Sequence, residues 1–159
     1  MSRLLAAVFL VVAAATGCGL RGHQEPRDGL KPDTARFAYG GRQVDVPLVA
    51  CGRDGDVVTL GGSRGVVVLQ AAADVSDGGT ARTGVTLDLG QGEIWGAFGD
   101  EMPRAAAGTV KDAKVEGDRL IVDATWAALD DNLATVPGGQ TIDGRLTARC
   151  PQADDKGVA

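Results

Sequence analysis

The spacing of glycine-rich turns constrains this chain more than any other feature of its sequence. From about residue 36 onward, short runs rich in Val, Leu, Ile and Thr are interrupted about every eight to twelve residues by glycine clusters. Turn signals at this spacing are typical of antiparallel strands joined by hairpins. We therefore predict an all-β domain over residues 36–151, either an antiparallel β-sandwich or a small barrel, with an α+β fold as the alternative.

The apolar runs predict strands at about residues 36–40, 43–50, 56–61, 65–72, 82–89, 92–98, 108–115, 119–127 and 140–149. Apolar and polar residues alternate most clearly in the last two, so each should bury one face. Residues 66–74 are apolar without alternation, which favours a strand covered on both sides. A short helix is the alternative there and at residues 127–134. Glycines in the segments 52–56, 89–93 and 116–119 should form the hairpin turns.

Three cysteines, Cys18, Cys51 and Cys150, organise the chain. Cys51 and Cys150 lie at the two ends of the Gly/Val-rich region, so they are natural disulfide partners in an oxidising compartment. By chain entropy, such a bond would stabilise the domain by about 4 to 5 kcal/mol. An exported chain with an odd number of cysteines leaves one over, and here that one is Cys18.

The first 17 residues have the features of an export signal. Arg3 precedes an uninterrupted apolar segment at residues 4–15, which has the length of a secretory h-region and is too short to span a bilayer as a helix. We therefore expect residues 1–17 to be a signal peptide. An Ala-x-Ala site at residues 13–15 would serve an ordinary signal peptidase.

A second interpretation of the same segment concerns Cys18. The preceding residues Ala15, Thr16 and Gly17 resemble the lipobox of bacterial lipoproteins, although Ala15 stands where leucine is usual. In that case Cys18 becomes the acylated first residue of the mature chain and holds it on a membrane. The alternative is a secreted chain whose Cys18 is a free or intermolecularly bridged thiol.

Charge and composition limit the partners of the mature chain. Residues 18–35 hold charges, Gly and Pro without an apolar period and predict a flexible tether, and residues 152–159 predict a solvated tail. The formal net charge is −5 for the whole chain, and removal of residues 1–17 with Arg3 makes it more negative by one; this argues against nucleic-acid binding and against electrostatic binding to anionic lipids. Attachment to the membrane would therefore depend on the acyl chains.

Catalytic and metal-binding chemistry has little support in this sequence. The only histidine, His23, lies in the tether, which excludes a Ser-His or Cys-His site in the domain, and both domain cysteines are assigned to the disulfide. The carboxylate pairs fall in predicted turns and lack calcium-loop spacing; they are Asp54/Asp56, Glu116/Asp118 and Asp130/Asp131. The glycine-rich pieces lack phosphate-binding spacing. We therefore expect no enzyme, no cofactor and no metal.

Two tryptophans stand out because the chain has few large apolar side chains. We expect Trp95 and Trp126 to be core or edge-capping residues, and the alternative is that they line a groove or lipid-sized cavity between sheets. The second arrangement would make the domain a carrier or binding module for a lipid or small hydrophobic ligand.

The order of these features resembles a known family. The cysteine and tether are followed by "CGRDGDVVTLGG", "GVVVL", "GVTLDLG", "KVEGDRLIVDATW" and "GRLTARC". Over residues 37–151 this pattern is similar to the mycobacterial 19 kDa lipoprotein antigen family. The resemblance implies a non-enzymatic actinobacterial lipoprotein on the outer face of the cell membrane, acylated at Cys18, with a Cys51–Cys150 disulfide. It also implies a surface antigen sensed by host receptors and an adhesin. The glycosylated Ser/Thr-rich tether of the family is absent, since residues 19–35 offer only Thr34.

Overall fold

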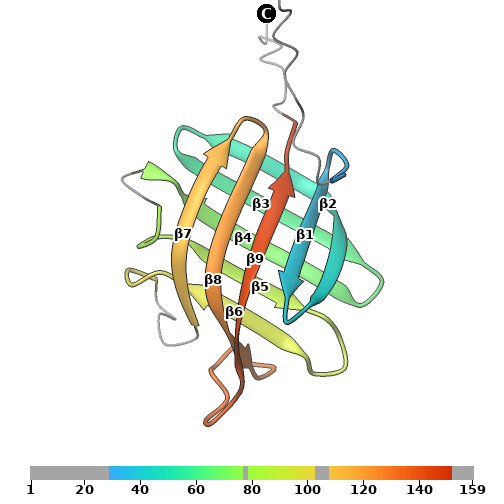
Figure 1. Cartoon of the computed structure of the whole chain (residues 1–159), viewed down its shortest axis with the longest axis vertical. Coiled ribbons are helices and arrows are strands. Elements are labelled where there is room, and N and C mark those ends of the chain that lie inside the picture. The colour runs from blue at the N-terminus through green and yellow to red at the C-terminus, as the bar shows by residue number, and fades with distance from the viewer. Residues whose placement is uncertain (1–28, 77–78, 103–107, 152–159) are drawn as a thin grey trace, which may run out of the picture.

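In the computed structural model, residues 29–76, 79–102 and 108–151 are described, and they form a closed nine-stranded β-barrel (Figure 1). The strands are β1 (Thr34–Tyr39), β2 (Arg42–Asp54), β3 (Val57–Arg64), β4 (Val67–Asp74), β5 (Gly84–Asp88), β6 (Ile94–Phe98), β7 (Gly108–Glu116), β8 (Arg119–Leu129) and β9 (Thr141–Arg149). Each strand corresponds to one of the predicted runs. The all-β prediction is therefore confirmed, in its barrel form.

Neighbouring strands pair antiparallel from β1 to β6, and β7, β8, β9 and β1 continue the sheet in the same way. The barrel closes where the end of β8 pairs with β6, as in the register Trp95↔Ala128, and where β6 meets β7 through the single parallel pair Phe98↔Thr109. A closed barrel has no edge strand open to pairing with another chain.

Strand β2 bends the sheet into two layers. Its first half pairs with β1 as far as Pro47, its second half pairs with β3 from Leu48 onward, and a bulge between Leu48 and Ala50 separates the halves. Bulges turn a strand through a corner, and strands that change sheets in this way produce nearly orthogonal layers. Figure 1 shows β7, β8, β9 and β1, here called the front sheet, crossing β3, β4, β5 and β6, here called the back sheet.

The space between the two sheets is filled by the inward-facing residues of every strand. The largest fully buried side chains are those of Trp126, Phe37, Leu69, Leu87, Leu120 and Leu146. Phe37 and Trp126 meet edge to face, with ring centroids 4.6 Å apart, and Phe37 stacks on Tyr39 at the same centroid distance. Valines, alanines and Leu60 fill most of the remaining positions, so the few aromatic rings pack among aliphatic side chains.

A second apolar cluster lies on the outside of β6. Ile94 and Phe98 point away from the barrel interior and pack against Leu129, together with Met102 and Leu133. All five residues of β6 are consequently buried, although β6 is a barrel strand with one outward face. The segment after β8 thus covers the outer surface of β6.

Neither helical alternative holds, and two expectations about the strands need correction. Residues 127–134 are not helical, because β8 continues to Leu129 and an open loop follows, in which Leu133 packs on the outer cluster. Residues 66–74 are not helical either, and β4 is not covered on both sides, since Val68 is 40% exposed. Finally, β1 begins at Thr34 and Leu30 is already buried, so folded chain begins before residue 36.

Candidate functional site

The predicted lipidation segment lies outside the described residues. This applies to Ala15, Thr16, Gly17 and Cys18, and also to His23. Within the described residues, no helix is long and apolar enough to cross a membrane.

The predicted disulfide joins Cys51 to Cys150, with their Cα atoms 5.9 Å apart. Cys51 belongs to β2 and Cys150 directly follows β9, so the bond links the corner of the barrel to the end of the front sheet. Its two cysteines are 99 residues apart in sequence, and the bond therefore closes almost the whole domain into one loop.

The first and last described residues meet at this same end of the barrel. The Arg149 guanidinium donates to the carbonyl of Leu30 at 3.2 Å and to the Asp118 carboxylate at 2.6 Å. The backbone N–H of Cys150 donates to the Asp118 carbonyl at 2.8 Å. Asp118 lies in the β7–β8 turn, so that turn binds the C-terminal residues directly and Leu30 only through Arg149. Any extension of the chain beyond either terminus starts from the disulfide end of the barrel.

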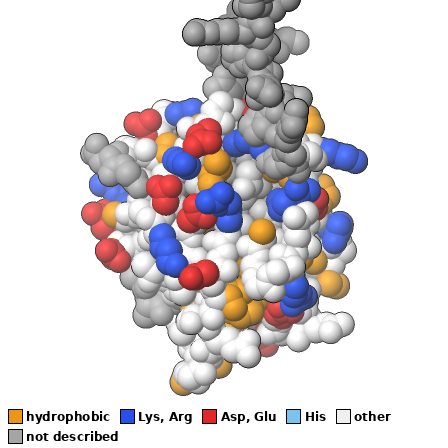
Figure 2. Space-filling view, viewed as in Figure 1, with side chains coloured by type: hydrophobic (Ala, Val, Ile, Leu, Met, Phe, Trp, Pro, Cys, Tyr) orange, Lys and Arg blue, Asp and Glu red, His pale blue; other side chains and the backbone are white. Residues whose placement is uncertain are grey.

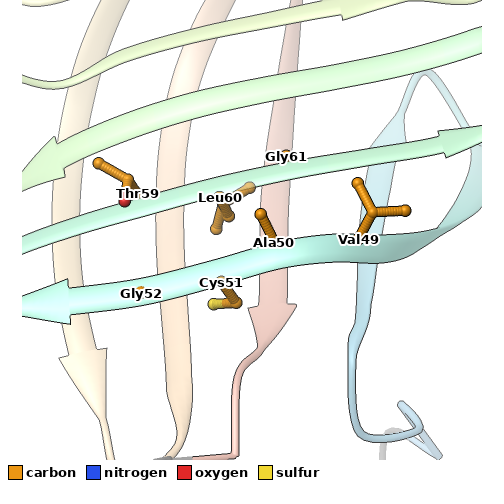
Figure 3. A pocket seen from close by; sticks show the side chains of 7 residues that line it. All are labelled: Val49, Ala50, Cys51, Gly52, Thr59, Leu60 and Gly61. Atoms are coloured by element: carbon orange, nitrogen blue, oxygen red, sulfur yellow. The ribbon is translucent and has the colours of Figure 1, made fainter.

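A shallow hollow lies on the outer surface of β2 and β3, close to the disulfide (Figure 3). It is lined by Val49, Ala50, Cys51, Gly52, Thr59, Leu60 and Gly61. The hollow is open above Gly52 and Gly61, which have no side chains. A Cβ added at either position would meet no atom closer than 3.7 Å. Val49, the bulge residue, stands at one side of the hollow and is 78% exposed.

The two tryptophans lie in the core of the barrel. Trp126 is fully buried and Trp95 is 6% exposed, so neither lines a groove on the surface. The indole N–H of Trp126 has no hydrogen-bond acceptor among the described residues, and the ring lies against Gly144, where a Cβ would come within 3.1 Å of Nε1. The absence of a side chain at Gly144 therefore makes the space that the Trp126 ring occupies.

A polar cluster that the sequence did not predict closes the opposite end of the barrel. One carboxylate oxygen of Glu93, Oε1, accepts hydrogen bonds from the Trp95 indole at 3.1 Å, the Arg42 guanidinium at 3.2 Å and the Tyr39 hydroxyl at 3.4 Å. Arg42 also lies over the Tyr39 ring, 5.0 Å from its centroid. Burial raises the pKa of Tyr39, and the Glu93 carboxylate raises this pKa further. The phenol therefore remains a neutral donor to Glu93 at physiological pH.

Nothing in the sequence pattern around Glu93 points to this cluster. Glu93 sits in a glycine turn, where an acidic residue is common, and its three donors come from a hairpin over fifty residues earlier in the chain and from the next strand. Tyr39 and Trp95 are 5% and 6% exposed, so their rings offer no open platform to a ligand. The cluster therefore closes this end of the barrel and provides hydrogen-bond partners for the polar side chains there.

The carboxylate pairs considered from the sequence have structural partners or point to solvent. Asp118 binds Arg149, and the Asp130 carboxylate accepts from the backbone N–H groups of Asn132 and Ala134 at 2.9 Å. Asp54 and Asp56 are exposed around the β2–β3 turn. No group of three or more His, Cys, Asp or Glu side chains that could hold a metal gathers in the described part of the chain.

Comparison of this chain with known protein families and with curated proteins finds no match.

Proposed function

We propose that this protein is a non-enzymatic lipoprotein of the cell envelope, anchored by acyl chains on Cys18 and displaying the barrel outside the membrane. The observation that carries the proposal is the use of the cysteines. Cys51 and Cys150 are bonded to each other, which is typical of proteins folded in an oxidising compartment. Cys18 is left over directly after a lipobox-like sequence.

The position of the termini supports a tethered barrel. The chain enters the barrel at Leu30, beside the disulfide and the β7–β8 turn. Leu30 is the twelfth residue after Cys18, and an extended chain of that length spans up to about 40 Å. An anchor at Cys18 would thus attach to the barrel at its disulfide end, and the mouth closed by Glu93 lies at the opposite end.

Display suits this domain better than carriage of a ligand. Rings of Trp126, Phe37 and Tyr39 occupy the space between the sheets, where a lipid carrier would need an open cavity. The resemblance to the mycobacterial 19 kDa lipoprotein antigens extends the proposal to a surface antigen and adhesin that meets a host receptor or an envelope component through its outer surface.

Intact mass spectrometry of the protein from the membrane fraction of its host tests the anchor, with a Cys18→Ala variant as the control. We expect acyl mass on a chain that begins at Cys18, and the mass gain of one disulfide on reduction. Cys18→Ala should lose the acyl mass and leave the membrane. A chain in the medium that begins at Thr16 and carries a free thiol would contradict the proposal.

A further inference from the structure

We draw no further inference here: the strongest candidate, the surface patch of exposed valines on β2 and on the β3–β4 hairpin around the shallow hollow, carries nothing, because nothing in the structure shows what covers it.

Discussion

The front and back sheets of this barrel share one core but have different outer surfaces. On the front sheet, charged side chains of both signs are interspersed (Figure 2) and paired across strands. Arg145 binds Asp123 through two contacts of 2.7 and 2.8 Å, and Lys111 binds Asp143 at 2.6 Å. The outward positions of β2 after the bulge, of β3 and of β4 hold mainly valine, alanine, glycine, threonine and glutamine instead, and we call this area the valine face after its exposed residues Val49, Val57 and Val68. Ion pairs across strands therefore cover the outer surface of the front sheet, and small uncharged side chains cover the valine face.

The cross-strand pairs also show how the front sheet keeps its register. Arg145 lies directly opposite Asp123 in the β8–β9 ladder, and Arg36 lies opposite Asp45 in the β1–β2 ladder. Opposite charges at registered positions favour one alignment of the strands, and a shift of one residue would separate them. On the valine face no comparable pairs set the register, so there it depends on inward side chains such as Leu60 and Leu69.

Among the contacts that join the two layers, the disulfide should lower the free energy of unfolding the most when it is removed. In Cys51→Ala/Cys150→Ala, the unfolded chain regains the freedom of a loop closed over 99 residues. We expect the free energy of unfolding to fall by about 4 to 5 kcal/mol. Urea denaturation of the variant and the parent measures the loss. Cys18→Ala should leave stability unchanged, and a loss confined to Cys18→Ala would reverse our assignment of the cysteines.

A glycine on the inner surface of the front sheet should be much less tolerant of substitution than those of the valine face. In Gly144→Ala, the new Cβ would lie 2.7 Å from the Ala38 carbonyl and 3.1 Å from the Trp126 indole nitrogen. Overpacking of this kind costs about 1 to 3 kcal/mol of stability. Denaturant unfolding followed by tryptophan fluorescence measures it. An unchanged midpoint would mean that Trp126 does not need the space above Gly144.

The strand positions could be predicted from the sequence because their signals are local. Glycine turns such as those at Gly55 and Gly117 adopt the expected positive φ, and inward residues such as Leu120 and Val122 alternate as predicted. The disulfide was predictable for a similar reason, since only two cysteines lie in the domain. These features depend on the composition and order of short segments.

The features that the sequence did not predict depend on contacts between distant segments. The bulge at Val49 bends β2 between its two partners, and only the complete barrel requires that bend. Glu93 gains its role from Tyr39 and Arg42, which are remote in sequence. The exposed side of β4 was missed because its apolar run suggested two buried faces, whereas Val68 faces outward on the valine face. An exposed strand face that carries valine has the same composition as a core.

The opposite response is expected at the centre of the valine face. Gly52→Ala places a methyl group in open space, with Thr59 Oγ1 as its nearest neighbour at 3.7 Å. The monomer should become more stable by about 0.4 to 1 kcal/mol, because alanine restricts the unfolded chain more than glycine does. Thermal unfolding at low protein concentration measures the gain. Destabilisation would show that the barrel itself needs glycine at this position, two residues after the β2 bulge.

The smallest expected effect concerns the pH dependence contributed by the front-sheet pairs. The hydrogen bond from Arg36, together with its charge and that of Arg64, lowers the pKa of Asp45. A lowered pKa in the folded state means that this stabilisation is fully present above the ordinary aspartate value of about 4 and is lost as pH falls through the folded value. Because the pair is partly exposed, its contribution should be at most about 1 kcal/mol.

Asp45→Asn should therefore lower the free energy of unfolding near neutral pH and flatten its decline below about pH 4. Urea titrations at several pH values measure both. Arg36→Met should produce the same flattening, and the double variant should add little, because both substitutions remove a single interaction. If the two losses add in full, the stabilisation comes from the separate environments of Arg36 and Asp45, and cross-strand pairing would no longer explain why the front sheet is charged while the valine face is not.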